Sequence, residues 1–369
     1  MITITFGFGG VYSKLSDALA AALPPAYENW ETDYEFVQVG YCFETSACTV
    51  LYTKYLNGHS ITIRSDTPHN GDPTAGHLFY SEVGAVLQFW GGGQSGAYIL
   101  RDMNIQINYS GVSNTAIFTF ANVGGSDMAS SVIIERCIII DYGSKAQQVI
   151  ANGGGEIYIL GCKLRSSSKA CYANSRYAPV EPVIIECTTC DGSIDPALFA
   201  NHIFRDCYAT NFARCTNALG YTNRSEDAMP TFLAGSSDNV GSIVPANEFK
   251  STTYTDAEWM FLKDSLLGTL GSAGTIPVYV SQDIAGNAIP NKGNYPVGCH
   301  ISETSVIFGN NYVWNLFKEK IYIFNEFGVV SFDGDEVTLV DTMPDDFVPF
   351  STYDYLGNIY VYGETTGAS

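Results

Sequence analysis

Four short apolar segments each end on a cysteine, and they recur at a nearly fixed interval along the chain. They are residues 131–137, 156–162, 182–187 and 201–207, so the cysteines at 137, 162, 187 and 207 lie 25, 25 and 20 residues apart. An earlier segment, 97–103, fits the same template with Met103 in the cysteine position. One short strand per repeat of this length is typical of a parallel β-helix, an all-β solenoid. We expect the four cysteines to stack in a column inside its core.

The composition agrees with a large β-fold and limits the possible partners. Apolar residues make up 46% and charged residues 15% of 369 residues, which is enough to bury a sizeable core. The net charge of −20 repels nucleic-acid phosphates and anionic membrane surfaces, although it also serves to keep an aromatic-rich β-protein soluble. No apolar run is long enough to span a bilayer, and the N-terminus lacks the pattern of a secretory signal. We therefore expect no nucleic acid, no membrane insertion, and synthesis in a host cytoplasm.

The ten cysteines are expected to be reduced thiols in the core rather than disulfides. Cys187 and Cys190 have the spacing of one half of a zinc site, but no second pair of cysteines or histidines completes it. We predict no zinc and no other cofactor.

The two ends of the chain have residue patterns that differ from those of the repeats. Apolar residues at helical spacing predict a helix over 15–23, with Ser13 as its cap and Pro24 as its stop. Such a helix would cover the apolar end of the first coil, so we expect a cap over 1–33 consisting of a strand and this helix. The solenoid and its closing segment should occupy 34–302. Alternating strands and a tight turn predict a small antiparallel β-module over 303–369, which would serve attachment or oligomerisation.

A set of local patterns covering roughly residues 1–300 resembles the pectate-lyase-like β-helix proteins that are common in tailed-phage genomes. The matching stretches are the turn at 9–13, the helix ended by proline, the strand in 57–66, and the closing segments 263–266, 283–286 and 297–298. The resemblance implies a right-handed β-helix, a homotrimer, and a place in a tailspike, head fibre or capsid decoration. Tailspikes usually carry an N-terminal particle-binding domain, and we expect none before this rod. The resemblance therefore implies attachment through 303–369 or through the flank of the rod.

Carboxylates that follow equivalent strands are the catalytic candidates. β-Helix enzymes cut polysaccharides with paired carboxylates in a groove along the rod. Here Asp102, Glu135 and Asp206 stand beside arginines at corresponding positions of their repeats. The alternative is a ladder of opposite charges that solvates a turn and fixes the register of the coils, and we favour it.

Two further groups of residues are weaker candidates. Asp333 and Asp335 have the look of a calcium loop, but a hairpin turn explains them equally well and no metal is predicted. Four tyrosines near the C-terminus are candidates for an interface, with a packed β-core as the alternative: Tyr353, Tyr355, Tyr360 and Tyr362.

Two functions follow as expectations. The first is a non-enzymatic structural protein on the virion exterior of a tailed phage, as a capsid decoration, spike or tail appendage. Its partners would be capsid or tail proteins and host-surface glycans. The second is a tailspike-type depolymerase that cuts host glycans, for which a groove with two carboxylates roughly 5 to 10 Å apart would be evidence.

Overall fold

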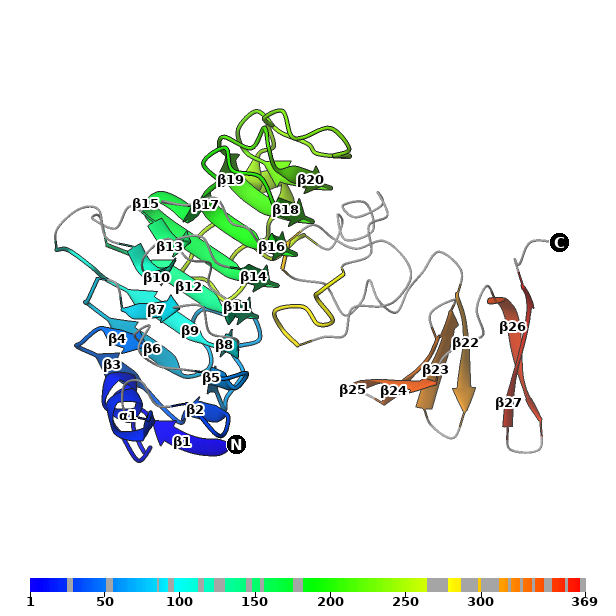
Figure 1. Ribbon diagram of the computed structural model, residues 1–369. Helices are drawn as coiled ribbons and strands as arrows, with labels where there is room; N and C mark the ends of the chain where they lie inside the picture. The colour runs from blue at the N-terminus through cyan, green and yellow to red at the C-terminus, as the bar shows by residue number, and fades with distance from the viewer. Residues whose placement is uncertain are drawn as a thin grey trace.

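The computed structural model shows a solenoid whose strands are all parallel, followed by small antiparallel sheets (Figure 1). It describes residues 1–24, 29–50, 56–84, 86–91, 96–111, 116–122, 130–143, 148–152, 156–174, 182–263, 278–286, 298–299, 312–317, 320–325, 328–333, 336–341, 347–355 and 358–365.

One face of the solenoid is a nine-stranded sheet with one strand from each coil. Its order is β1 (Ile2–Phe6), β2 (Tyr34–Gln38), β5 (Ser60–Ser65), β8 (Gly96–Arg101), β11 (Ser130–Glu135), β14 (Ile157–Leu160), β16 (Val183–Glu186), β18 (His202–Arg205) and β20 (Leu219–Tyr221). Since β1 pairs in parallel with β2, the solenoid begins at residue 2 and not near residue 34.

The other strands form a second sheet that bends around the remaining faces. Its path is β3 (Cys42–Glu44), β6 (Leu78–Ser81), β9 (Asn104–Ile107), β12 (Ile138–Asp141), β15 (Lys163–Asn174), β13 (Gln148–Asn152), β10 (Ala116–Asn122), β7 (Leu87–Gly91) and β4 (Cys48–Val50). Off this path, β17 (Thr189–Asp195) pairs with β15 and β19 (Tyr208–Phe212), which pairs with β21 (Arg224–Ser225). These stacked parallel sheets confirm a right-handed parallel β-helix.

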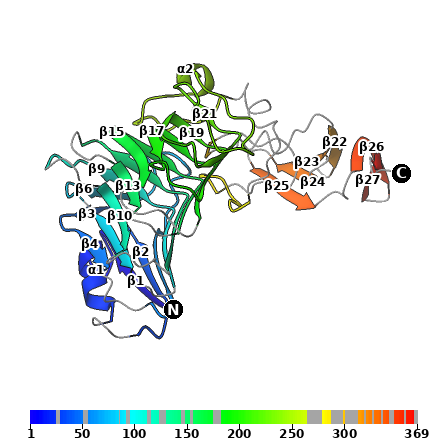
Figure 2. The ribbon, with the colours of Figure 1, turned by 45° about the horizontal axis from the view of Figure 1, so that its top comes forward.

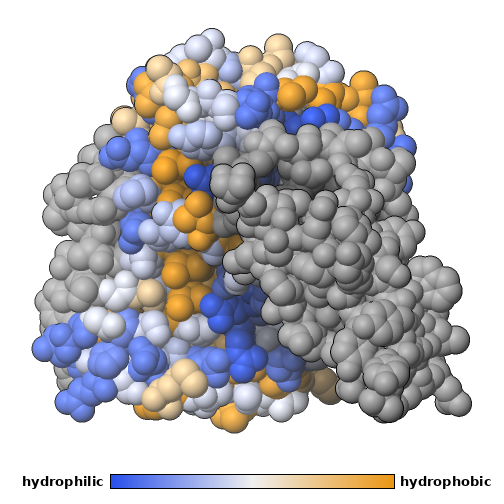
Figure 3. Space-filling view, turned by 90° about the vertical axis from the view of Figure 1, so that its right-hand side faces the viewer, coloured by the Kyte–Doolittle hydropathy of each residue, from blue (hydrophilic) through white to orange (hydrophobic). Residues whose placement is uncertain are grey.

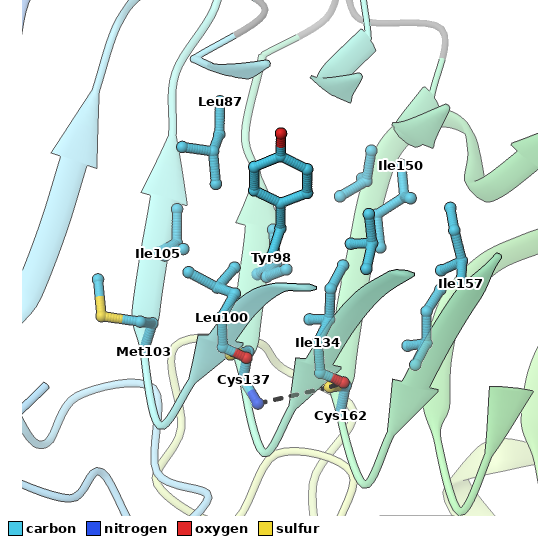
Figure 4. Close-up of a cluster of buried hydrophobic side chains, with 14 of the residues drawn as sticks. Leu87, Tyr98, Leu100, Met103, Ile105, Ile134, Cys137, Ile150, Ile157 and Cys162 are labelled. Carbon is cyan, nitrogen blue, oxygen red and sulfur yellow. Dashed lines mark hydrogen bonds between the residues drawn. The ribbon is translucent and has the colours of Figure 1, made fainter. Parts of the chain in front are cut away.

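Thiols do line the inside of one corner of the solenoid, where each coil passes from the nine-stranded sheet to the next strand (Figure 4). The Cys137 amide donates to Cys162 Sγ at 3.4 Å, and Met103 occupies the same position one coil earlier. Further along, the Cys207 amide donates to Asn223 Oδ1 at 3.0 Å. The column therefore joins neighbouring coils by hydrogen bonds as well as by packing.

Cys187 is not a member of this column, which corrects the sequence-based expectation. Glu186 pairs with Leu160, so Cys187 falls one position early and Thr188 fills the place of the cysteine. The Thr188 hydroxyl lies 3.4 Å from the Cys162 amide and 3.3 Å from the Ile159 carbonyl oxygen. A small hydroxyl can stand in for a thiol here because it satisfies backbone groups inside the core.

The N-terminal end is closed by a short helix, α1 (Leu15–Ala22), as expected (Figure 2). Leu15, Ala18 and Leu19 are buried against the first coils. Ser13 does not cap this helix. Instead the buried carboxylate of Glu44 accepts hydrogen bonds from the Ser16 amide and hydroxyl at 3.0 and 2.8 Å. A carboxylate at a helix N-terminus is favourable because it satisfies free N–H groups and the helix dipole.

After the last coils the chain turns back along the outside of the solenoid, past the short helix α2 (Pro245–Glu248). Trp259, Met260 and Leu262 pack there on the outward-facing Ile138 and Ile140. Beside them, the fully buried ammonium of Lys163 donates to the carbonyl oxygens of Gly71 and Trp259 and lies 3.6 Å from the centre of the Phe261 ring. Burial lowers the pKa of Lys163 to about 7.

The C-terminal strands form two antiparallel sheets, as the sequence indicated. One contains β22 (Tyr312–Phe317), β23 (Lys320–Asn325), β24 (Gly328–Asp333) and β25 (Glu336–Asp341), and the other β26 (Phe347–Tyr355) and β27 (Asn358–Thr365). Among the described residues, no strand of these sheets pairs with the solenoid. No described helix has the length and apolar character needed to cross a membrane.

All ten cysteines are free and buried, which leads to a first prediction. In the folded protein a water-soluble thiol reagent should label none of them, since burial also raises the pKa of thiols such as Cys137 and Cys207. After unfolding without reductant, ten thiols should react. Fewer than ten in the unfolded chain would mean that disulfides are present.

Candidate functional site

The corner that carries the thiol column inside carries charges outside. From β8 to β20 each coil turns there within one residue that has a left-handed backbone conformation: Asp102 (φ 55°), Arg136 (48°), Gly161 (60°), Cys187 (49°), Asp206 (53°) and Thr222 (55°). The residue before each of them ends a strand of the nine-stranded sheet and also faces outward. Equivalent residues of successive coils therefore stack, and this corner brings the three catalytic candidates onto one edge of the rod.

Asp102 and Glu135 are held in a compact network of ion pairs. Arg136 binds Asp102 through two hydrogen bonds, with Nε–Oδ1 at 2.7 Å and Nη2–Oδ2 at 3.0 Å. Arg136 Nη1 also contacts Glu135 Oε1 at 2.7 Å, and Arg101 Nε contacts Glu135 Oε2 at 2.8 Å. All four carboxylate oxygens are thus engaged. This geometry is that of a charge ladder between coils, and it leaves neither carboxylate free to act as an acid or base.

We expect the ladder to add little stability. The side chains of Glu135 and Arg101 are 19% and 41% exposed, so solvent screens much of their attraction. Replacing Glu135 with glutamine should lower the free energy of unfolding by only about 1 kcal/mol. Urea unfolding of the two proteins measures this, and a loss several times larger would show that the ladder is a principal stabilising element.

Glu186 and Asp206 form a second and different cluster on the same corner. The Glu186 carboxylate is fully buried and accepts hydrogen bonds from three consecutive backbone amides, those of Val278, Tyr279 and Val280, at 3.0, 2.7 and 3.0 Å. It also pairs with Arg205 at 2.6 Å. Glu186 therefore fastens the returning chain, which we call the return segment (278–280), onto the corner.

Asp206 lies beside Glu186 and is 2% exposed, and its Oδ2 has no hydrogen-bond partner among the described residues. Burial, and then the charge of Glu186, raise the pKa of Asp206 to about 7. Below that pH a protonated Asp206 stands beside Glu186, which is paired with Arg205, and hydrolases use a protonated carboxyl group next to a second carboxylate for acid–base catalysis. Both groups are covered, so no polymer reaches them in this conformation.

Sequence analysis identified Asp206 but missed Glu186. The signal was available, because Glu186 occupies the strand-ending position held by Arg101 and Glu135 in other repeats. What the sequence does not show is the partner, since the amides that bind Glu186 lie 92 to 94 residues later in the chain.

The other candidate residues lie in the C-terminal sheets, of which the structure describes the strands but not the side chains. Asp333 ends β24 opposite Glu336, which confirms a tight hairpin, while Asp335 falls outside the described residues. Tyr353 pairs with Tyr360 across β26 and β27; Tyr355 and Tyr362 belong to the same two strands. A search of the described residues finds no cluster of three or more histidine, cysteine or acidic side chains suited to a metal.

Comparisons with known proteins add little to this geometry. No family model matches the chain, and no curated protein matches it. Among solved structures it is similar to the pectin methylesterase from Aspergillus niger in its deglycosylated form, with 12% identity, 72% of this chain and 92% of that chain covered, and a TM-score of 0.34. The strand pairing itself is what shows the right-handed parallel β-helix fold.

Proposed function

We propose that this chain is a non-enzymatic structural protein on the outer surface of a tailed-phage particle, as a capsid decoration, spike or tail appendage. The observation that carries the proposal is the state of the conspicuous carboxylates. Asp102 and Glu135 form ion pairs with neighbouring arginines. Glu186 and Asp206 are buried, and Glu186 is bound by the return segment. These acids stabilise a rod and present no exposed catalytic pair.

The outer face of the nine-stranded sheet supports a homotrimer built by flank packing. An apolar stripe runs along this face (Figure 3). Its residues pair in register from coil to coil and alternate with core positions: Ile99, Ile133, Tyr158, Ile184, Ile203 and Leu219. In the middle of the row Ile184 is buried, and Val280 of the return segment packs with Ile133 and Tyr158. The ends of the row, at Ile99, Ile203 and Leu219, are partly exposed, and copies around a threefold axis can bury them.

Immunogold labelling tests the proposed location. An antibody raised against the full chain should label the outside of intact, purified phage particles from a host that carries the gene. The particle proteins bound by the chain would be capsid or tail proteins. Labelling that is confined to the soluble fraction of the infected cell would contradict a virion role.

A depolymerase acting on host-surface glycans is the second candidate, favoured by Asp206, whose pKa is raised to about 7, beside the carboxylate of Glu186. The assay is release of reducing ends or unsaturated sugars from purified host capsule or lipopolysaccharide. The structural proposal predicts no release by the wild-type chain. Release that is lost in Asp206→Asn or Glu186→Gln would establish the enzyme instead.

A further inference from the structure

We propose that the return segment is a pH-controlled strap, which is fastened to the corner while Asp206 is protonated and opens more easily once Asp206 ionises. The three consecutive amides of this segment all donate to the buried carboxylate of Glu186. A change in the surroundings of that one carboxylate therefore acts on the whole segment.

The returning chain also passes over the turn residues of the corner. Gly161, Cys187 and Asp206 occupy equivalent turn positions in three successive coils. A Cβ on Gly161 would lie 3.8 Å from Val280 Cγ1, and Val280 packs with Cys187. The Gly298 amide donates to the Asp206 carbonyl oxygen at 2.8 Å. Asp206 is 2% exposed, so lifting this part of the chain would return water to its carboxyl group.

The cluster has one positive charge for two buried carboxyl groups. Arg205 pairs with Glu186 at 2.6 Å, while Asp206 Oδ2 and Arg205 Nε are buried without a hydrogen-bond partner in the described part of the chain. The remaining groups around Asp206 are hydroxyl groups and thiols from the neighbouring coils and the closing chain: Thr222, Tyr221, Cys187, Cys207 and Cys299. Ionisation of Asp206 therefore places a second negative charge beside Glu186 with no further cation to offset it.

The cost of this second charge is paid only while the strap is closed. Burial, and then the charge of Glu186, raise the pKa of Asp206 from 3.8 to about 7 in the closed form. In the open form the solvated carboxyl group returns toward its ordinary pKa. The closed form thus holds the proton more tightly, and its advantage is lost as the pH rises from about 4 to about 7. Opening should become up to about 500-fold more favourable between pH 4 and pH 8.

The strap covers the middle of the apolar row on the flank. Val280 belongs to one apolar cluster with Leu160, Ile133 and Tyr158, and the Tyr279 ring lies 5.4 Å from that of Tyr158. Opening would uncover these side chains, so a flank contact between copies would gain apolar area above pH 7. This consequence rests on the proposed flank packing, whereas the strap itself does not.

Hydrogen exchange of the full chain tests the strap, with protection factors corrected for the pH dependence of exchange in free amides. In wild type the protection of the Val278, Tyr279 and Val280 amides should fall by about 500-fold between pH 4 and pH 8. In Asp206→Asn, whose side chain has the same shape but cannot ionise, it should change only a few-fold. Glu135→Gln removes a charge from the same corner and should behave like wild type.

Low concentrations of urea distinguish opening of the strap from unfolding of the whole chain. Local opening exposes little surface, so exchange of the three amides at pH 8 should hardly depend on urea, whereas exchange of the β11 amides should accelerate with it. The proposal is overturned if wild type and Asp206→Asn lose equal protection between pH 4 and pH 8. It is also overturned if the three amides show the same urea dependence as β11. No particle takes part in this experiment, so its result is separate from that of the immunogold test.

Discussion

Replacing Glu186 with alanine is expected to lower the free energy of unfolding by about 4 kcal/mol, the largest effect of any single change to a surface corner. The substitution leaves the partly exposed Arg205 guanidinium without its carboxylate and three backbone amides without their acceptor. Glu186→Gln should lower the free energy of unfolding by less than Glu186→Ala does, because glutamine keeps an acceptor oxygen but loses the charge.

Urea unfolding measures the loss, and hydrogen exchange locates it. The amides of Val278, Tyr279 and Val280 should exchange faster in Glu186→Ala, whereas the amides of the core strands should keep their order of protection. Glu135→Ala is the matched control, because Glu135 is a partly exposed strand-ending acid on the same corner. If Glu186→Ala costs no more than Glu135→Ala, Glu186 does not hold the return segment.

Replacing Asp206 with asparagine is expected to make the protein more stable at pH 8 by as much as about 4 kcal/mol, and to change little at pH 4. The pKa of Asp206 is raised from 3.8 to about 7 in the folded chain. Between these values the folded state holds a proton that the unfolded state has released, so stability is lost as the pH rises from about 4 to about 7 and then levels off. Asparagine cannot ionise, and it tolerates the left-handed conformation at this position (φ 53°).

The comparison between the two proteins isolates this one group. His69 and His202 are buried, which lowers the pKa of each to about 4, so both proteins lose stability to the same extent as the pH falls below 6.5. Urea unfolding of wild type and Asp206→Asn between pH 4 and 8 should give curves that nearly meet at pH 4, diverge as the pH rises to about 7, and stay apart above it. Parallel curves would show that Asp206 is not a buried, protonated carboxyl group.

The fold could be predicted from sequence because the spacing of the strands along the chain sets the length of each coil. Short apolar runs that recur every 20 to 25 residues specify stacked coils, and His202 does take the inward position of Val132 in its repeat, as register requires. The position of Cys187 could not be predicted by counting cysteines. Pairing is set by the strand residues, and these align Glu186 with Leu160 and so place Thr188 in the column.

The candidate site was predictable only in part, for a physical reason. Charges at the ends of stacked strands must neutralise one another, so the ladder around Glu135 follows from local spacing. The cluster at Glu186 depends on backbone amides of the return segment, which carry no side-chain signature. The same holds for Lys163, whose burial depends on Trp259 and Phe261, almost a hundred residues further along the chain.

The in-register stacking of coils is the central claim, and an engineered disulfide tests it most directly. Arg101 and Glu135 are paired residues on neighbouring strands with outward-facing side chains, and every native thiol is buried. Their Cα atoms should be about 5 Å apart, within disulfide range, whereas Arg101 and Leu160 lie two strands apart at about 10 Å. Under mild oxidation Arg101→Cys with Glu135→Cys should form a bond that peptide mapping detects, and Arg101→Cys with Leu160→Cys should form none. A bond in the second pair, or none in the first, would contradict the register and the functional account built on it.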